Sequence, residues 1–379
     1  MAVIKPGNNT RRSAAIVLVL DVFLVLAASY SLCVFLGICA WPFSATHLFS
    51  KASVSSIHNS SVTKFGIHFT DSRAIEVGQA LHIQAERFSY AMGTAVPPSA
   101  ANIAAAEKAG IGAVVTYTNV ANPNGTGTRT DPRAGPTPDA VFETSFTAAL
   151  DATHPTIAVM QNEEDNLASW GGTTDEYLHM LSLAARIAHA KRYPITNGGI
   201  SSGGLDIAYW HYLWMSGDHQ AADAFARVAF AANIITDKKQ ILGDIPDSTN
   251  PARVIFGNNS ILRAKLTRVE ALIVGYKATG IDYINAHWYE VPPSAKGRAL
   301  AWLGQTTGLQ VMSNEMGVYE TNPPLITSML NEAITLQMPY AVWNANIGMA
   351  GNNSPLVDQS TAAILPNGIA FKDFVLAHP

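Results

Sequence analysis

Short apolar runs alternate with amphipathic stretches along the sequence from about residue 62 onward. Each run contains a few consecutive apolar residues and ends in polar or aromatic ones, which is typical of strands buried in a parallel sheet. We expect eight strands, at 64–69, 80–87, 113–117, 156–162, 194–198, 283–289, 310–315 and 340–344. Helical periodicity predicts helices between them, at 99–109, 138–150, 173–191, 261–278, 294–305 and 324–336.

Helix ends are indicated by local signals. Thr173 and Glu176 have the spacing of a capping box at the start of one helix. Gly110, Gly280 and Gly308 each follow a predicted helix, where a left-handed cap favours glycine. The interval 200–283 is too long for one helix, so we expect an extra helix there and a long loop around 244–259. The aromatic residues of that extra helix are Tyr209, Trp210, Tyr212 and Trp214.

The alternation of strands and helices predicts the fold. Consecutive strand–helix–strand units form a parallel sheet with right-handed crossovers. Eight units within 62–379 fit a closed α/β barrel of the (β/α)₈, or TIM, type, which commonly has 200 to over 400 residues. We expect 62–379 to form this single barrel domain.

The N-terminal segment has a different pattern. Residues 14–41 are mostly apolar and have one charge, Asp21, and at about 1.5 Å per residue a helix of this length could cross a bilayer core of about 30 Å. Lys5, Arg11 and Arg12 precede it, so we expect a signal-anchor with 1–13 in the cytoplasm, 42–61 as a tether, and the barrel outside. A cleaved signal peptide, cut near Ala27, is the alternative and would give a secreted barrel.

Composition excludes several classes of protein. Apolar residues make up 48% and charged residues 14%, which argues against disorder. The net charge is −4 and no basic run occurs, so we expect no nucleic-acid partner. The two cysteines, Cys33 and Cys39, precede the barrel, and no metal-binding motif is found, so we expect neither a metal nor another cofactor. No feature indicates an oligomeric state.

Two glutamates follow predicted strands at equivalent places. Glu163 follows the fourth strand and Glu315 ends the seventh. Because the carboxyl ends of all barrel strands lie at one mouth, we expect both side chains there. A pair of carboxylates, one carrying a proton and one ionised, is what cleavage of a glycosidic bond requires.

The residues at the other strand ends extend this pattern. Arg87 ends the second predicted strand, His287 and Tyr289 share one face of the sixth, and Trp343 lies in the eighth. Asn-Glu after strand four, His-x-Tyr at strand six, Glu at strand seven and Trp at strand eight resemble the clan A retaining glycoside hydrolases. That group includes β-glycanases and β-glycosidases of the family 5 and family 39 kind, and the resemblance covers the whole barrel.

The resemblance implies a role for each of these residues. Glu163 would be the general acid/base and Glu315 the nucleophile of a double displacement that cleaves β-glycosidic bonds in a poly- or oligosaccharide. Asn162 would contact the sugar 2-hydroxyl. Arg87 and Tyr289 would position Glu315, His287 would line the −1 subsite, and Trp343 would be its stacking floor.

The same sequence allows other interpretations. Gly199-Ile200-Ser201-Ser202-Gly203 matches the G-x-S-x-G elbow of serine hydrolases, and Asp282 and His287 could complete a triad with Ser201. A barrel that binds carbohydrate without cleaving it is a third possibility.

Glu164 and Asp165 are interpreted as loop charges, and His68 as one of several scattered histidines. Glycosylation sequons are found at Asn59, Asn124, Asn258 and Asn352.

Overall fold

The strands form one closed parallel sheet. The computed structural model describes residues 62–70, 72–93, 99–232, 260–289, 291–318, 321–345, 355–358 and 360–379. The strands are β1 (Lys64–His68), β2 (Ala85–Met92), β3 (Gly112–Asn119), β4 (Ile157–Met160), β5 (Ile195–Asn197), β6 (Tyr283–Asn285), β7 (Trp288–Tyr289), β8 (Gln310–Gly317) and β9 (Tyr340–Asn344). The sheet order β6-β5-β4-β3-β2-β1-β9-β8 closes because β6 also pairs with β8. This confirms the predicted parallel eight-position barrel.

The sixth barrel position is divided between two short strands. β6 ends at Asn285, and the chain resumes as β7, which pairs with β8 through Trp288 and Tyr289. His287 lies in the interruption between them. The His287 ring therefore lies where the hydrogen-bonded pairing between the strands is interrupted.

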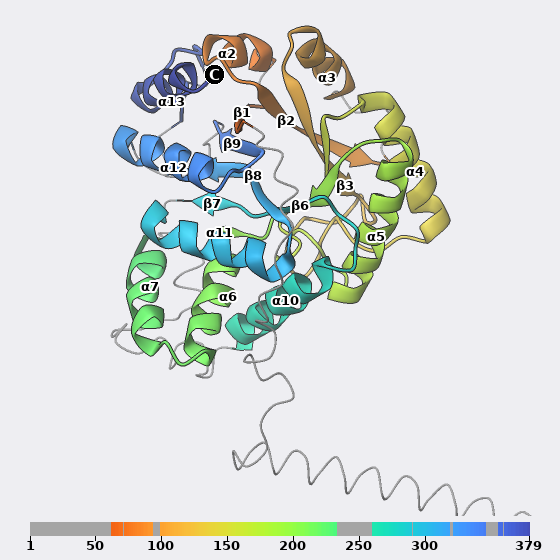
Figure 1. Ribbon diagram of the computed structural model, residues 1–379. Coiled ribbons are helices and arrows are strands. Elements are labelled where there is room, and N and C mark those ends of the chain that lie inside the picture. Colours follow the sequence, from red (N-terminus) through yellow and green to blue (C-terminus); the bar gives the residue numbers. More distant parts are fainter. Residues whose placement is uncertain are drawn as a thin grey trace, which may run out of the picture. The chain divides into compact units, whose positions relative to one another are not determined.

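The helices lie outside the strands (Figure 1). They are α2 (Ala74–Ala80), α3 (Ser99–Lys108), α4 (Asp139–Thr153), α5 (Thr174–Ala190), α6 (Ser202–Met215), α7 (His219–Ala232), α10 (Ser260–Tyr276), α11 (Pro293–Thr307), α12 (Pro323–Thr335) and α13 (Pro366–Ala377). The predicted extra helix is confirmed as α6. The short α2, α7 and the C-terminal α13 are additional to the predicted elements.

Two predicted helix-end signals are confirmed. Thr173 Oγ1 accepts a hydrogen bond from Glu176 N, and Glu176 Oε2 accepts one from Thr173 N, which completes the capping box of α5. Gly110, Gly280 and Gly308 have φ angles of 76°, 80° and 73°. Only glycine adopts this left-handed conformation at little cost.

The strand faces form two cores. Ala85, Val114, Ile157, Val159, Met312, Tyr340 and Val342 fill the barrel interior. The opposite faces of the strands pack on the helices, as Phe65 of β1 does on Phe374 of α13, with ring centroids 5.5 Å apart. Alternation between these two cores determines which residues can reach the mouth of the barrel.

The second strand begins later than predicted. Residues 80–84 are not strand, because α2 extends to Ala80 and the chain turns at His82, whose φ is 58°. Leu81 and Ile83 are buried in this turn, so these apolar residues belong to a packed turn and not to a strand. β2 then continues to Met92, which places Arg87 in its first half.

Several predictions concern segments outside the described residues. These are the cytoplasmic flank 1–13, the membrane-spanning segment 14–41, the tether 42–61, the loop 244–259 and the sequons at Asn59, Asn258 and Asn352. In the part of the chain that the structure describes, no helix is both long and apolar enough to cross a bilayer. Asn124, the remaining sequon, is exposed in the loop after β3.

Candidate active site

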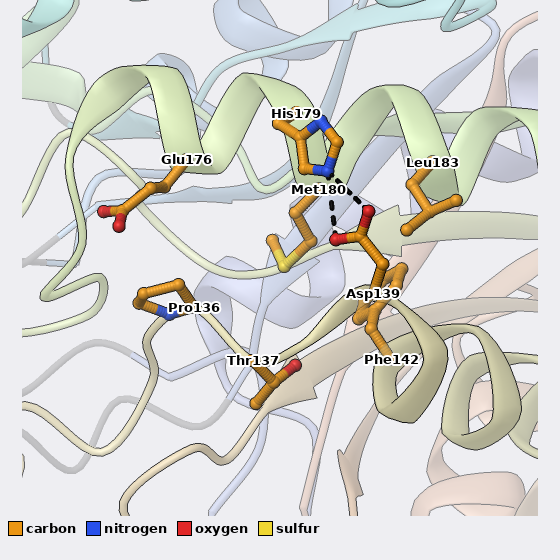
Figure 2. A pocket seen from close by; sticks show the side chains of 8 residues that line it. All are labelled: Pro136, Thr137, Asp139, Phe142, Glu176, His179, Met180 and Leu183. Carbon is orange, nitrogen blue, oxygen red and sulfur yellow. Dashed lines mark hydrogen bonds and ion pairs between the residues drawn. The ribbon is translucent and has the colours of Figure 1, made fainter.

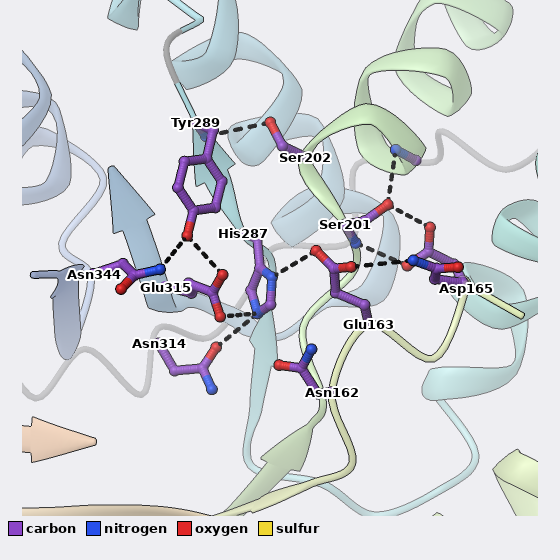
Figure 3. Close-up of polar contacts among 12 residues, drawn as sticks. Asn162, Glu163, Asp165, Ser201, Ser202, His287, Tyr289, Asn314, Glu315 and Asn344 are labelled. Atoms are coloured by element: carbon purple, nitrogen blue, oxygen red, sulfur yellow. Dashed lines mark hydrogen bonds and ion pairs between the residues drawn. The ribbon is translucent and has the colours of Figure 1, made fainter. Parts of the chain in front are cut away.

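Glu315 and Glu163 both lie beside His287 at the carboxyl ends of their strands (Figure 3). Glu315 belongs to β8, and Glu163 follows β4 by three residues. The His287 Nδ1 atom lies 3.1 Å from Glu163 Oε1, and its Nε2 atom lies 3.9 Å from Glu315 Oε2. One imidazole ring therefore spans the gap between the two carboxylates, as expected for side chains at one mouth.

A β-bulge in β8 turns two consecutive side chains toward this site. Ser313 pairs with Ala341 and Met316 with Trp343, so three steps on β8 match two on β9. Without the extra residue, Asn314 and Glu315 would point to opposite faces of the sheet. With it, Asn314 contacts His287 while Glu315 contacts Tyr289.

Glu315 is surrounded by donors. Its Oε1 accepts a hydrogen bond from the Tyr289 hydroxyl at 2.6 Å, and its Oε2 accepts one from Arg87 Nη1. Burial by itself would raise the pKa of Glu315, but the positive charges of His287 and Arg87 and the Tyr289 hydroxyl outweigh it. The net result is a pKa well below the ordinary value, so the carboxylate is ionised at neutral pH.

Arg87 orients a second site residue. The guanidinium group is almost fully buried and donates from Nη2 to Asn162 Oδ1 at 2.6 Å and from Nε to Thr116 Oγ1 at 3.1 Å. Because Asn162 Oδ1 accepts from Arg87, the amide presents its Nδ2 as the group for further donation. The late start of β2 does not remove Arg87 from the site, since its side chain points to the barrel interior.

The His287 ring carries or shares a proton on each side. Its Nε2 lies 3.1 Å from Asn314 Oδ1, which also accepts from Asn285 Nδ2 and is therefore an acceptor. The Nε2 atom thus bears hydrogen, and the contact between Nδ1 and Glu163 requires one further proton between those two atoms. Burial would lower the pKa of His287, but the two carboxylates raise it above its ordinary value.

Glu163 lies in a tight turn rather than in a strand. Its φ is 44°, and that of Gln161 is 71°, both in the left-handed region that side chains other than glycine rarely adopt. Asn166 N donates to Glu163 O at 2.7 Å and closes the turn. The Gln161 side chain is buried, and neither of its amide atoms has a hydrogen-bond partner among the described residues. The turn therefore combines unfavourable backbone angles with a buried amide group.

The two acidic residues after Glu163 are buried, which corrects their interpretation as loop charges. Glu164 Oε1 accepts from Asn197 Nδ2 at 2.7 Å and from the Tyr276 hydroxyl. Burial raises the pKa of Glu164 to about 7, although these hydrogen bonds act in the opposite direction. Asp165 accepts two hydrogen bonds from Ser201 and lies 3.5 Å from Lys265 Nζ. Glu164 therefore faces the protein interior, whereas Glu163 faces the mouth.

Trp343 does not lie at the mouth, which corrects the predicted stacking floor. The side chain of its neighbour Asn344 points inward and donates to the Tyr289 hydroxyl at 2.8 Å. By the alternation of the strand, Trp343 points outward, where its indole is 1% exposed and packs on Phe371 of α13. Its peptide bond to Asn344 is trans.

The serine-hydrolase triad is not assembled, which removes that alternative. Ser201 Oγ donates to Asp165 Oδ2 at 2.6 Å and accepts from Gly204 N as the cap of α6. Both nitrogens of His287 face other partners, and Asp282 contacts His189 and Ile195 N at the opposite end of β6. The G-x-S-x-G pattern arises here from a helix cap.

Sequence reasoning missed three residues that contribute to the site. Asn314 and Asn344 contact His287 and Tyr289, and each adjoins a residue already singled out. His68, at the end of β1, lies close enough to Arg87 and Glu315 to interact electrostatically with both. Burial and the Arg87 charge lower the pKa of His68 to about 3, so this ring is neutral at pH 7. Its position at a strand end was the available signal.

No metal centre accompanies this arrangement within the described ranges, because no three His, Cys, Asp or Glu side chains there are placed to share an ion.

A separate pocket lies between α4 and α5 (Figure 2). Its lining consists of Pro136, Thr137, Asp139, Phe142, Glu176, His179, Met180 and Leu183. His179 Nε2 lies 3.0 Å from Asp139 Oδ2 at the surface, and neither Glu163 nor Glu315 belongs to this pocket.

Comparisons with known proteins support the fold. No protein-family model matches the sequence, and no curated protein matches it significantly. Among solved structures, fungal β-1,4-galactanases match with a TM-score of 0.50 at 12% identity, over 83% of this chain and 99% of theirs. An exo-β-1,3-glucanase of family 128 from Aureobasidium namibiae matches with a TM-score of 0.47 at 9% identity, over 82% and 96%. At such identities the galactanase likeness shows the barrel fold alone, and membership of family 5 or 39 stays a prediction.

Proposed function

We propose that this chain is a retaining glycoside hydrolase that cleaves β-glycosidic bonds of an oligo- or polysaccharide without a cofactor. The observation that carries the proposal is the pair of carboxylates on either side of His287, with Glu315 accepting from Arg87 and Tyr289. One carboxylate is kept ionised and the other shares a proton, which is the division of roles that a double displacement requires.

In the proposed first step, Glu315 attacks the anomeric carbon and forms a glycosyl ester, while Glu163 donates a proton to the leaving oxygen. In the second step, Glu163 accepts a proton from water, which attacks the same carbon and restores the Glu315 carboxylate. The contact between Glu163 Oε1 and His287 Nδ1 supplies the proton for the first step. Asn162 would offer its Nδ2 to the sugar 2-hydroxyl, since its Oδ1 accepts from Arg87.

The test is a screen of the soluble barrel, residues 62–379, against aryl β-glycosides, with product configuration followed by ¹H NMR. Retained configuration supports double displacement, and inverted product would indicate a single displacement through water. The carboxyl groups of Glu163 and Glu315 are expected about 5–5.5 Å apart, the retaining separation. Hydrolysis that persists in the E163Q/E315Q double variant would overturn the assignment of these residues.

A carbohydrate-binding barrel without activity makes a different prediction. Such a protein would bind oligosaccharides in calorimetry and release no product even with activated aryl glycosides. A panel that shows binding without turnover would therefore favour the binding function over hydrolysis.

We also propose that segment 14–41 anchors the protein in a membrane with the barrel on the extracytoplasmic side. The support is the apolar sequence of that segment and the basic residues before it. Protease added to intact cells is expected to digest the barrel. Protection in intact cells followed by digestion after lysis would contradict this topology, and a shortened soluble product would indicate cleavage of the segment.

A further inference from the structure

The serine pair, Ser201 and Ser202, lies where α6 begins and contacts two separate parts of the candidate site (Figure 3). Both residues are buried. Ser201 contacts the turn that carries Glu163, and Ser202 contacts the strand that carries Tyr289. The G-x-S-x-G segment thus joins the surroundings of both carboxylates.

The contact from Ser201 fixes the orientation of Asp165. Ser201 N donates to Asp165 Oδ1 at 2.8 Å, and Ser201 Oγ donates to Oδ2 at 2.6 Å. Asp165 lies inside the four-residue turn that begins at Glu163. Because both carboxylate oxygens are bonded to one residue, the turn cannot rotate without breaking two hydrogen bonds.

The contact from Ser202 acts on the other carboxylate. Ser202 Oγ accepts from Tyr289 N at 3.3 Å, and the Tyr289 hydroxyl donates to Glu315 Oε1 at 2.6 Å. Fixing the backbone of Tyr289 therefore helps to fix its hydroxyl against Glu315.

A buried lysine fixes Ser202 in turn. Lys296 Nζ of α11 donates to Ser202 O at 3.0 Å, to Ser202 Oγ at 2.9 Å and to Asp206 Oδ1 at 2.7 Å. These contacts match the three donors of an ammonium group. Lys296 and Asp206 are both fully buried, so the pair is not weakened by solvent.

We propose that the serine pair is a positioning element with two separable arms: Ser201 orients Glu163 through Asp165, and Ser202 orients Glu315 through Tyr289. This inference rests on the proposed function for its catalytic meaning, but the positioning can be measured without turnover. Neither serine touches the reacting atoms.

Two adjacent glycines in the first turn of α6 provide a matched pair of variants. A Cβ at Gly204 would lie 2.3 Å from Asp165 Oδ2 and 2.9 Å from Ser201 Oγ. A Cβ at Gly203 would meet no atom of the described part of the chain within 4 Å. G204A therefore disturbs the Ser201 arm sterically, and G203A is the control with the same change of residue in the same helix.

The experiment is ¹³C NMR of the protein labelled at glutamate carboxyl carbons, with the two signals assigned by their loss in E163Q and E315Q. In S201A we expect the Glu163 signal to shift and the Glu315 signal to stay in place. In S202A we expect the reverse. G204A is expected to resemble S201A, and G203A to resemble the wild type.

A role in stability alone would give a different pattern. Both signals would then move together, or neither would move, in folded S201A and S202A, and either outcome overturns the proposal. Should S201A fail to fold, G204A against G203A decides the Glu163 arm. K296M, which removes the donors to Ser202, decides the Glu315 arm in the same way.

Kinetics then separate this inference from the proposed function. If the wild type cleaves aryl glycosides, S201A is expected to lose about tenfold more rate on poor leaving groups than on good ones, the equivalent of one hydrogen bond at the acid. S202A is expected to lose rate equally on both. If the wild type cleaves no glycoside, the proposed function fails, and the carboxyl signals still decide whether the two arms exist.

Discussion

The two carboxylates of the candidate site belong to different kinds of structure. Glu315 belongs to a strand of the closed sheet, has a side chain 16% exposed, and accepts from a guanidinium and a phenol. Glu163 belongs to a turn, has a side chain 25% exposed, and contacts an imidazole and the Asn166 amide. Glu315 therefore lies among groups that always donate hydrogen bonds, whereas Glu163 lies beside a histidine that can gain or lose a proton.

This difference indicates how a barrel can assign two roles to one kind of side chain. Arg87 and Tyr289 donate to Glu315 and stabilise its ionised form. His287 can either give a proton to Glu163 or take one from it. Glu315, the proposed nucleophile, is fixed by strand pairing, whereas Glu163, the proposed acid/base, lies in a turn that faces the mouth.

The largest expected effect is on the Glu315 side. E315A is expected to reduce glycoside cleavage by on the order of 10⁵-fold, because within the described residues no other carboxylate is placed to form the covalent intermediate. Mass spectrometry after incubation with a 2-fluoro glycoside should detect a glycosyl-enzyme in the wild type and none in E315A. Labelling of E315A at another carboxylate would show that the two sides are wrongly assigned.

On the Glu163 side the loss is expected to depend on the leaving group. E163A should lose about 10²–10⁴-fold with a poor leaving group and little in the first step with a dinitrophenyl glycoside, which needs no protonation. The intermediate should then accumulate as a burst, and azide should restore turnover as a glycosyl azide of retained configuration. E164A is the matched control, since Glu164 faces Tyr276 and Asn197. Azide rescue of E164A instead would move the acid/base by one residue.

The ionised state of Glu315 can be tested through Tyr289. Y289F removes a hydrogen bond that lowers the pKa of Glu315, so that pKa is expected to rise. Since the attacking group is the carboxylate, activity is lost as pH falls through this pKa. The acidic limb of kcat/KM should therefore move to higher pH in Y289F while the alkaline limb stays in place. Movement of both limbs would contradict the separation of the two sides.

The smallest effects are expected in β9, where neighbouring residues point to opposite faces. N344A removes the donor to the Tyr289 hydroxyl and should reduce kcat a few-fold through Glu315. W343F should leave KM unchanged and lower the free energy of unfolding by about 1–3 kcal/mol, because the indole packs on Phe371. Steady-state kinetics measure kcat and KM of the two variants, and chemical denaturation measures the free energy of unfolding. A large rise of KM in W343F would return Trp343 to the sugar subsite.

Much of the barrel could be predicted because its signals are local. Apolar runs that end in polar residues locate the strands, and the four residues from Thr173 to Glu176 are enough to identify the helix cap. The start of β2 was misplaced because Leu81 and Ile83, buried in a turn, have the same apolar character as a strand. A short helix such as α2 leaves too little periodicity to be recognised.

The site was predicted less completely, because it depends on the direction of individual side chains. The bulge in β8 lets Glu315 face the site together with Asn314, and no local pattern in the sequence indicates it. Trp343 was assigned to the mouth by resemblance, whereas the register of β9 directs it to the helices. The contacts of Ser201 and Ser202 join residues 36 and 87 positions apart, a distance over which periodicity carries no information.

The left-handed angles at Gln161 and Glu163 have a consequence for how this protein would respond to selection. A non-glycine residue in that conformation costs about 1–2 kcal/mol, and glycine would remove the cost. A variant library selected only for survival of heating should therefore enrich glycine at both positions, whereas one selected for turnover should retain Glu163. Sequencing the survivors of the two selections would show whether thermal stability and the proposed acid/base role favour different residues at position 163.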